Sequence, residues 1–273
     1  MRYALFGKEA KGGHMERAVL ITGATGGLGR EFARQYAKAG HDVALVARKR
    51  AALEGLAEEL RAEYGTETAV FPCDFTDPSA PAKLHRELSE QGISPDILVN
   101  NAGLGYDAPF MESDMPTQET LMDVNMAALT KMMRLFGPDM AKRGKGGILN
   151  VASIASYPEG PYMATYYASK AYVRSLTEAV HTELLGSGVH VTALCPGPVR
   201  TDFWERASAG STILAHLAVS PKGIVSAGRR ALRWNLSSYV PGLPWKFVAF
   251  ATRLLPRSWV RLAAAQLQKP KGH

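Results

Sequence analysis

Strand, turn and helix follow one another in Ala18-Val-Leu-Ile-Thr22-Gly-Ala-Thr-Gly-Gly-Leu-Gly29, which continues directly into Arg30-Glu-Phe-Ala-Arg-Gln-Tyr36. The first residues are an apolar run of strand length, and the last segment has a helical pattern. Glycine lets a chain turn tightly and lets backbone amides approach a phosphate, which is stabilised at the positive end of the following helix. The stretch therefore predicts a dinucleotide pyrophosphate at a strand–turn–helix junction.

Further apolar runs of strand length alternate with stretches of helical period along the chain. The predicted strands are Ala18–Thr22, Asp42–Ala47, Thr68–Phe71, Ile97–Asn100, Gly147–Val151, Val189–Leu194 and a short one near Tyr239–Val240. The predicted helices are at about Gly29–Ala39, Arg50–Tyr64, Pro78–Glu90, Pro116–Lys142 and Thr165–Leu185. This alternation predicts an α/β fold, a single doubly wound Rossmann-type parallel sheet with helices on both faces. Its ligands should lie beyond the carboxyl ends of the strands.

The charge of the chain is unevenly distributed. Its 273 residues carry 32 Lys and Arg against 25 Asp and Glu, a net charge of +7, and 46% are hydrophobic. This composition is typical of one large α/β domain and excludes disorder, collagen-like repeats and a small disulfide scaffold. No acid follows Glu205, and eleven basic residues lie from Arg206 onward, so that segment carries +11 and the remainder 21 − 25 = −4.

Cysteine use and hydropathy bear on the cellular compartment. Cys73 and Cys195 each end a strand-like run, which indicates reduced thiols rather than a disulfide. Residues 1–14 lack the apolar region of a signal peptide, and no run reaches the roughly 20 apolar residues that span a bilayer. We therefore expect a cytoplasmic protein. Because Met15 lies just ahead of the first predicted strand, we interpret residues 1–14 as a leader or an upstream extension outside the fold.

Cations follow the second predicted strand, in Val43-Ala-Leu-Val-Ala47-Arg48-Lys49-Arg50. NAD-binding sheets place an Asp or Glu near this position to accept hydrogen bonds from the ribose, whereas the 2′-phosphate of NADP favours a guanidinium. Ala47 and the three cations thus predict NADP(H) as the cofactor, with Arg48 as the main phosphate contact. The alternative is a solvated basic helix start, which the positive helix N-terminus would disfavour.

A tyrosine and a lysine share one predicted helix in Tyr166-Tyr167-Ala-Ser-Lys170, which begins thirteen residues after Ser153. Positions four apart lie on one helix face, so Tyr166 and Lys170 can point into the same cleft. A free phenol has a pKa of about 10, and a nearby ammonium would lower it. The pair can then act as acid toward a ketone oxygen and as base toward an alcohol. Tyr167 competes for this role, because it also lies near Lys170.

Together these segments resemble the short-chain dehydrogenase/reductase family, over about Ala18 to Val240. The turn from Thr22 to Gly29 resembles the family's cofactor signature. Two further segments extend the resemblance, namely Asn100-Asn101-Ala102-Gly103 as the motif that stabilises the sheet and Pro196-Gly-Pro-Val-Arg-Thr201 as the loop beside the nicotinamide. The resemblance implies hydride transfer between NADP(H) and a carbonyl or alcohol.

The resemblance also assigns roles to residues. The family's Tyr-x-x-x-Lys spacing selects Tyr166 as the acid, which leaves Tyr167 as a packing residue. Ser153 would orient the substrate oxygen, and Asn125 would hold a water that links Lys170 to solvent. The implied catalytic set is Asn125, Ser153, Tyr166 and Lys170. The implied cofactor-binding set is Gly23, Thr25, Gly26, Gly27, Leu28, Gly29, Arg48, Asp74, Phe75, Asn101, Ala102, Gly103, Tyr166, Lys170, Pro196, Gly197, Val199 and Thr201.

Within the cofactor-binding set, Asp74 and Phe75 would border the adenine and Asn101 the adjacent ribose, while Val199 and Thr201 would hold the carboxamide. No cluster of histidine, cysteine and carboxylate has metal-ligand spacing, so no metal site is predicted. Ser153 is not a hydrolase nucleophile, because no Gly-x-Ser-x-Gly turn surrounds it.

A substrate lid is predicted at about 202–221. Its apolar residues are Phe203, Trp204, Ile213, Leu214 and Leu217, and the opposite wall would comprise Tyr157, Tyr162 and Met163. Such a lining favours a lipophilic substrate, namely an aryl or cyclic ketone, a steroid or an oxoacyl chain. The alternative is that these side chains only pack the lid against the sheet.

The chain is thus divided into residues 1–14, a dinucleotide-binding catalytic domain at 15–240, and a basic amphipathic C-terminal extension at 241–273. Pro256 should divide the extension into two helices. Three interpretations of the extension remain: it lies peripherally on an anionic membrane, it covers the lid or packs on a partner subunit, or its cations attract an anionic substrate such as an acyl thioester of coenzyme A. Nucleic-acid binding is not expected, because no known reading motif accompanies the charge.

The favoured function is an NADP(H)-dependent carbonyl reductase or alcohol dehydrogenase. One alternative is a non-catalytic dinucleotide sensor, which should tolerate loss of the tyrosine or the lysine. Another is a membrane-recruited scaffold, which would need the extension and not the catalytic set. The resemblance further implies a homo-oligomer, dimer or tetramer, formed through the helices at about Pro116–Lys142 and Thr165–Leu185.

Overall fold

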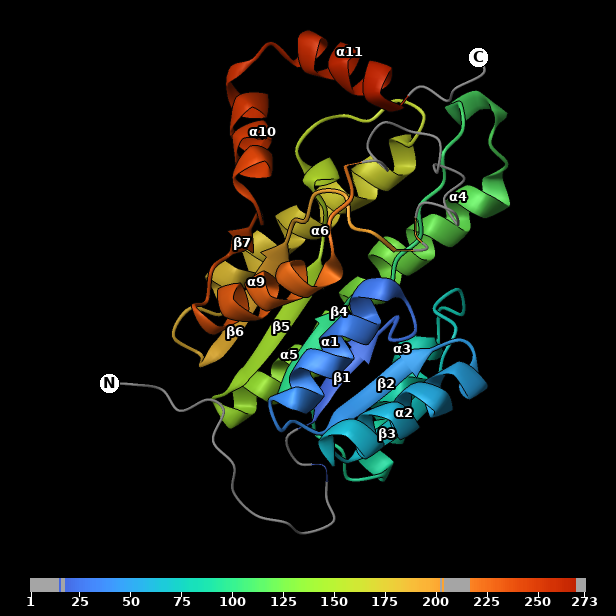
Figure 1. The fold of residues 1–273 in the computed structure, drawn as a ribbon, viewed down its shortest axis with the longest axis vertical. Helices are drawn as coiled ribbons and strands as arrows, with labels where there is room; N and C mark the ends of the chain where they lie inside the picture. Colours follow the sequence, from blue (N-terminus) through green and yellow to red (C-terminus); the bar gives the residue numbers. More distant parts are fainter. Residues whose placement is uncertain (1–14, 16–17, 202, 204–216, 269–273) are drawn as a thin grey trace.

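Seven strands form one parallel sheet in the order β3-β2-β1-β4-β5-β6-β7 in the computed structural model, which describes residues 15, 18–201, 203 and 217–268 (Figure 1). The strands are β1 (Val19–Thr22), β2 (Val43–Ala47), β3 (Thr68–Pro72), β4 (Ile97–Asn100), β5 (Gly146–Val151), β6 (Val189–Leu194) and β7 (Ser238–Tyr239). Every neighbouring pair is parallel, with Ile21 opposite Leu45 on one side and Val99 on the other. The predicted doubly wound sheet is confirmed. The strand order reverses between β1 and β4: β2 and β3 are added on one side of β1, and β4 to β7 on the other.

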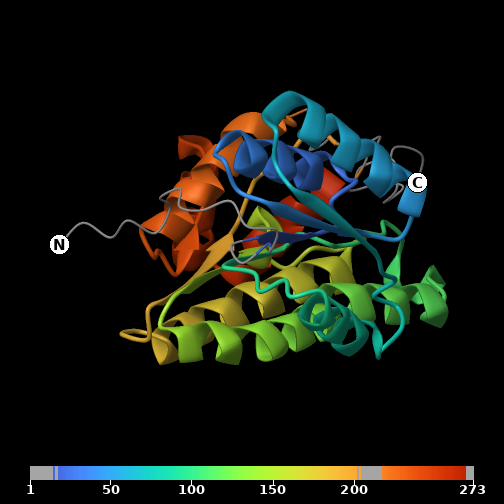
Figure 2. The same ribbon diagram turned by 90° about the horizontal axis from the view of Figure 1, so that it is seen from below.

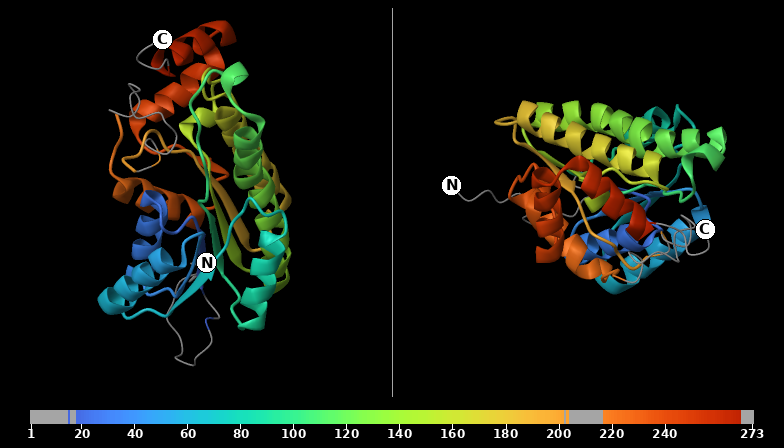
Figure 3. Two further views of the ribbon diagram at one scale, coloured as in Figure 1. Left: turned by 90° about the vertical axis from the view of Figure 1, so that its right-hand side faces the viewer. Right: turned by 90° about the horizontal axis from the view of Figure 1, so that it is seen from above.

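The helices form a layer on each face of the sheet (Figure 2; Figure 3). One layer contains α1 (Gly27–Lys38), α2 (Arg50–Tyr64) and α9 (Pro221–Arg233), which bury Phe32, Leu53 and Val225. The other contains α3 (Ala80–Glu90), α5 (Leu129–Arg143) and α6 (Ala164–Glu183), which bury Leu84, Met132 and Val173. Because both faces are covered, β1, β2, β4 and β5 are buried along their whole length rather than alternating between buried and exposed residues.

The helix predicted at about Pro116–Lys142 is interrupted in a way that its sequence did not indicate. It comprises α4 (Met115–Met122), a π-helical segment η2 (Asp123–Ala128) and α5. A π-helical segment inserts an extra residue per turn and occurs often at functional sites. Here it contains Asn125, whose side chain is buried.

The C-terminal extension forms α10 (Leu243–Leu254) and α11 (Arg257–Gln268), which meet at a sharp corner (Figure 1). As predicted, the break falls at Pro256, so Arg253 and Arg261 do not share one continuous helical stripe. Trp245 of α10 packs against the loop after β6, where a Cβ on Gly197 would lie 2.4 Å from the indole. No helix in the described ranges is long and apolar enough to cross a membrane.

Several predicted segments lie outside the described residues. These are the leader at 1–14 and the lid residues Trp204, Ile213 and Leu214, together with the extension beyond Gln268. Of the predicted lid, the structure describes Phe203 and residues 217–221.

Candidate active site

The turn after β1 presents backbone groups at the carboxyl edge of the sheet. Gly23 has a φ of +64°, a conformation that favours glycine, and a Cβ on Gly29 would lie 2.1 Å from the carbonyl oxygen of Gly23. The N-terminus of α1 therefore packs directly against the end of β1. It has no side-chain cap and no acid in its first turn, so its amides and its positive end are available to an anion.

The segment after β4 fixes this turn through side-chain hydrogen bonds. The amide of Asn101 donates to the carbonyl oxygens of Thr22 (3.0 Å) and Gly23 (3.1 Å). The hydroxyl of Thr22 accepts hydrogen bonds from the backbone N–H groups of Asn101 and Ala102, both at 3.0 Å. These four hydrogen bonds hold the turn in one arrangement.

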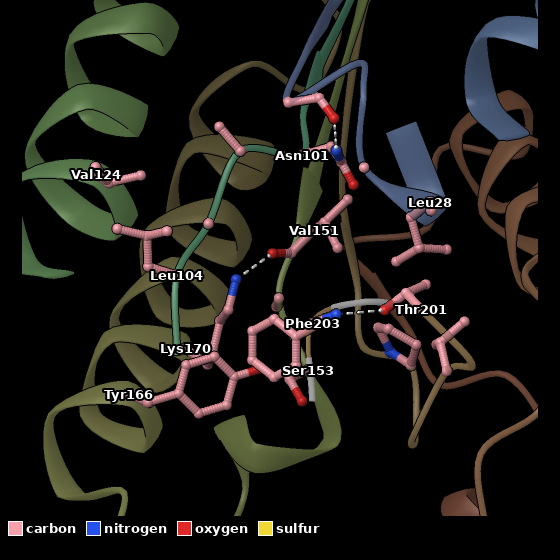
Figure 4. A pocket seen from close by; sticks show the side chains of 18 of the residues that line it. Leu28, Asn101, Leu104, Val124, Val151, Ser153, Tyr166, Lys170, Thr201 and Phe203 are labelled. Carbon is pink, nitrogen blue, oxygen red and sulfur yellow. Dashed lines mark hydrogen bonds between the residues drawn. The ribbon is translucent and has the colours of Figure 1, made fainter. Parts of the chain in front are cut away.

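One pocket of about 520 Å³ runs along this edge from the turn to α6 (Figure 4). It brings together almost all of the predicted site residues, namely Gly23, Thr25, Gly26, Gly27, Leu28, Arg48, Asp74, Phe75, Asn101, Ala102, Gly103, Ser153, Tyr166, Lys170, Pro196, Gly197, Val199 and Thr201. Two predicted residues do not line it. Gly29 lies behind the turn, and Asn125 lies beneath the loop after β4.

Tyr166, Lys170 and Ser153 converge at one end of the pocket (Figure 4). Ser153 follows β5 and its hydroxyl caps the short helix η3 (Ile154–Ser156), accepting from the N–H of Ala155 at 3.1 Å. Lys170 donates from Nζ to the carbonyl oxygen of Val151 at 2.9 Å, and Nζ lies 5.8 Å from the centre of the Tyr166 ring. The phenol and the ammonium thus face the same space from one helix.

Burial controls the protonation of this group. It raises the pKa of Tyr166 above its ordinary value, although a hydrogen bond with Ser153 partly opposes the rise. It also lowers the pKa of Lys170 to about 8. In the protein without cofactor, the pKa of the phenol is therefore raised and not lowered as the sequence predicts, because removal from water is the largest effect.

Asn125 joins the π-helical segment to the site. Its Oδ1 accepts from the N–H of Leu104 at 2.8 Å, and its Nδ2 donates to the carbonyl oxygen of Leu104 and to the hydroxyl of Ser169. A Cβ on Gly103 would lie 3.4 Å from both Asn125 Oδ1 and Lys170 Nζ, so the two side chains approach the same glycine. The water link expected from Asn125 stays a prediction.

The cations after β2 lie where the sequence predicts them. Arg48 and Lys49 line the pocket, whereas Arg50 points toward Glu54 on α2 at 3.6 Å and does not line it. Within the described ranges, no acid forms an ion pair with Arg48. A 2′-phosphate would thus meet a guanidinium that is free to bind it.

The predicted substrate wall is partly wrong. Met163 and Phe203 line the pocket, and the rings of Phe203 and Tyr166 are 5.4 Å apart. Tyr157 instead packs under the guanidinium of Arg174, 4.4 Å from it, and Tyr162 does not line the pocket either. The ring of Tyr157 packs against the hydrophobic core instead of facing the pocket.

Some lining residues carried no usable sequence signal. Leu104, Val124 and Ala155 resemble ordinary core residues, and Gln268 lies in a helix that is mostly exposed. Tyr167, predicted to be a packing residue, does pack tightly but also lines the pocket. Both cysteines are free, and burial raises the pKa of each thiol to about 11. The described part of the chain contains no group of three His, Cys, Asp or Glu arranged to hold a metal ion.

A profile of the short chain dehydrogenase family matches residues 17–211. Among solved structures, a short-chain dehydrogenase from Sphingobium yanoikuyae in complex with NADPH aligns with a TM-score of 0.78 and 31% identity. The alignment covers 87% of this chain and 93% of that one.

Two curated relatives show the same likeness in sequence. The very-long-chain 3-oxoacyl-CoA reductase of Anas platyrhynchos is 35% identical over 199 residues, which are 71% of this chain and 64% of that protein. The sulfoacetaldehyde reductase 2 of Chromohalobacter salexigens is 37% identical over 191 residues, 69% of this chain and 75% of that protein. The match thus spans less than two thirds of the length of the first relative.

Burial of Lys170 predicts a pH-dependent difference in stability between the protein and its Lys170→Met variant. Between pH 8 and 10 the unfolded lysine binds a proton that the folded one has lost, so the free energy of unfolding rises with pH. Relative to the variant, the protein should gain up to about 1.4 kcal/mol per pH unit in this range. Urea unfolding at several pH values measures the difference. The exposed Lys131→Met is the control, and a pH-independent difference for Lys170→Met would contradict the prediction.

Proposed function

The chain belongs to the short-chain dehydrogenase family, and on that premise we propose that it is an NADP(H)-dependent oxidoreductase that interconverts a ketone or aldehyde and an alcohol. The observation that carries the proposal is the convergence of Tyr166, Ser153 and Lys170 in the pocket that begins at the glycine turn. Proton donor, hydrogen-bonding hydroxyl and ammonium thus lie beside a dinucleotide-type cradle.

The residues of the chain fit the cofactor. The uncapped N-terminus of α1 would bind the pyrophosphate, Arg48 the 2′-phosphate, and Asp74 with Phe75 the adenine. A Cβ on Gly27 would lie 2.4 Å from the Thr201 side chain, so the turn and the nicotinamide-side loop are in contact where both line the pocket. When bound, NADP(H) supplies or accepts the hydride.

The protein's own contribution is to orient the carbonyl and to move a proton. Ser153 donates a hydrogen bond that orients the substrate oxygen, and Tyr166 gives its phenolic proton to that oxygen in the reduction. Lys170 donates one hydrogen bond from Nζ to the carbonyl oxygen of Val151. This contact directs the other two N–H donors of the ammonium toward the pocket. Its ammonium stabilises the phenolate that the transfer leaves behind.

The substrate is proposed to be a lipophilic ketone or its alcohol. Beyond Tyr166 the pocket is lined by Met163, Phe203 and Ala155, which offer an apolar surface. The names of the two relatives refer to chemically different substrates, an oxoacyl thioester and a small sulfonated aldehyde. Because the two relatives differ in substrate, the proposal of a lipophilic ketone rests on the apolar lining of this chain's own pocket.

We also propose a peripheral membrane contact through the C-terminal helices. Apolar side chains recur along one face of α10 and continue on α11; this outer tail face comprises Leu243, Phe247, Phe250, Leu254, Trp259 and Leu262, all exposed by more than half. Arg253, Arg257 and Arg261 accompany it, and no acid occurs after Glu205. Aromatic side chains next to cations, without acids, are typical of a helix on an anionic lipid surface. A homo-oligomer through the helices at about Pro116–Lys142 and Thr165–Leu185 stays a prediction.

Tyr166→Phe should keep NADPH affinity and lose nearly all turnover, because it removes the proton donor and leaves the ring. Turnover is measured as NADPH oxidation across steroid, oxoacyl and aryl ketones, and affinity by fluorescence titration. Tyr172→Phe, the same change at an exposed position of the same helix, is the matched control. Undiminished turnover in Tyr166→Phe would refute its role. If the unaltered protein binds NADPH but oxidises none with any ketone, the sensor alternative is favoured.

Arg48→Ala should raise the dissociation constant for NADPH by about tenfold or more, because a charge-assisted hydrogen bond is lost. The constant for NADH should barely change, since NADH lacks the 2′-phosphate. Arg50→Ala is the control, because Arg50 is a neighbouring cation that does not line the pocket. Equal effects of Arg48→Ala on both cofactors would show that the guanidinium does not read the phosphate.

The protein should co-sediment with vesicles that contain phosphatidylglycerol, and high salt should weaken this binding. Replacing both Phe247 and Phe250 by Ser should reduce vesicle affinity at least tenfold. Burial of each phenyl ring in the lipid contributes at least about 1 kcal/mol to the free energy of binding. Phe110→Ser is the control, since Phe110 is also exposed but lies far from the tail in the sequence. If the unaltered protein stays in the supernatant at low salt, the membrane proposal is wrong.

A further inference from the structure

Two polar side chains that the proposed mechanism does not use line the same pocket. Tyr167 follows the acid Tyr166 on α6, and Gln268 ends α11, 101 residues further along the chain. Both are removed from solvent, with exposed fractions of 7% and 1%. Burying polar groups costs free energy unless they find partners, so their presence beside the reaction centre calls for an explanation.

The structure holds the two side chains in place. Gln268 donates from Nε2 to the phenolic oxygen of Tyr167. A Cβ on Gly160 would lie 2.3 Å from the Tyr167 ring, so that glycine and the ring are in close contact and the ring cannot swing toward it. The rings of Tyr166 and Tyr167 meet edge to face with centres 6.0 Å apart. The pair therefore sits immediately beside the proton donor, in a fixed position.

Each member of the pair retains unused hydrogen-bonding capacity. Gln268 Oε1 is buried and has no hydrogen-bond partner within the described ranges. Tyr167 uses its oxygen as an acceptor, and its hydroxyl hydrogen has no acceptor among the hydrogen bonds of the described residues. Buried polar atoms without partners are rare in native proteins, and one that lines a pocket indicates a ligand group.

We propose that Tyr167 and Gln268 form a subsite for a neutral polar group of the substrate, a hydroxyl, separate from the carbonyl that is reduced. The proposal rests on the oxidoreductase function above and narrows its substrate class. A hydroxyl accepts from the Tyr167 O–H and donates to Gln268 Oε1. If the Gln268 amide is rotated so that its two polar atoms exchange places, a hydroxyl still complements it, because it both donates and accepts.

The surroundings exclude an anionic group at this position. Asp107 lies close enough for its charge to raise the pKa of Tyr167, and its Oδ1 is buried without a partner. Burial raises the pKa of Asp107 to about 6, so at neutral pH the carboxylate is present and repels a second anion. Burial is also the main reason that the pKa of Tyr167 is raised, which keeps its proton in place as a donor.

The C-terminal extension thereby takes part in selecting substrates. Gln268 reaches the pocket only because α10 is seated by Trp245 against Gly197 and α11 returns across the edge of the sheet (Figure 3). Ala264, one turn earlier, faces inward with it, while Gln266 is exposed. A change in how α11 packs would therefore alter which ketones bind well.

Matched aryl ketones test the subsite in the full-length protein. We would compare kcat/KM at saturating NADPH for para-(hydroxymethyl)acetophenone and para-ethylacetophenone, and for the corresponding meta pair. The two members of a pair have nearly the same shape, and an apolar pocket alone would favour the ethyl compound. The subsite should instead favour the hydroxymethyl compound at least tenfold in one pair, because the ethyl compound leaves Gln268 without a partner.

Gln268→Leu and Tyr167→Phe should each reduce this preference at least tenfold. The change should come from a lower kcat/KM for the hydroxymethyl compound, while NADPH affinity stays unchanged. Gln266→Leu, the same change on the exposed face of α11, should leave it as it was. Tyr167→Phe removes a single oxygen, so it gives a folded comparison if Gln268→Leu is unstable. A preference for the ethyl compound in both pairs would overturn the proposal. A preference for the hydroxymethyl compound that persists in both variants would overturn it as well.

Binding of the same ketones to the NADP⁺-loaded protein, measured by calorimetry, separates this inference from the proposed function. If neither ketone is reduced but the hydroxylated one binds tighter and Gln268→Leu abolishes the difference, the subsite stands and the assigned reaction fails. If both ketones are reduced with equal efficiency and bind equally, the reaction stands and the subsite fails.

Discussion

The site depends on one backbone contact, between the carbonyl group of Gly23 and the Cα of Gly29. Any side chain at Gly29 would place its Cβ 2.1 Å from that oxygen, so only glycine lets the N-terminus of α1 close against the end of β1. Asn101, directly after the neighbouring strand β4, fixes the turn by donating hydrogen bonds to the carbonyl oxygens of Thr22 and Gly23. Backbone amides at a positive helix end thus reach the carboxyl edge of the sheet, where Ser153 follows β5 and the loop from Pro196 to Thr201 follows β6.

Burial at the other end of the pocket sets the resting protonation state. A low-dielectric surrounding disfavours both the phenolate of Tyr166 and the ammonium of Lys170, yet Lys170, with a pKa of about 8, still carries its proton at neutral pH. At rest, therefore, the phenol of Tyr166 keeps its proton and the amine of Lys170 is an ammonium. Alcohol oxidation needs the phenolate first, which this environment makes costly until further positive charge lies nearby.

The sequence predicts those features whose chemistry is local. The glycine turn, the four-residue step from Tyr166 to Lys170 and the apolar strands each follow from spacing along a single element, and the fold they predict is the one observed. Features that depend on the packing of distant segments are not predicted by the sequence. The π-helical turn around Asn125 adds one residue to a helix whose periodicity shows no break, and Gln268 contacts Tyr167 across 101 residues through the path of two helices. A glutamine in an otherwise exposed helix has no local pattern that marks it as part of a pocket.

The C-terminal helices have an inner face that is buried against the protein and an outer face that is exposed, apolar and flanked by cations. This difference bears on what covers the outer face. The inner face buries Ala249, Ala264 and Gln268 against the body of the protein, so the helices are already seated without a partner. A second copy packed on the outer tail face would bring its Arg253 and Arg257 toward the same cations, with no acid in either extension to separate them. An anionic lipid surface removes this repulsion and accepts the aromatic side chains at the same time. Since α11 carries both Gln268 and part of that face, such a contact would place the pocket wall next to the lipid from which a lipophilic substrate would enter.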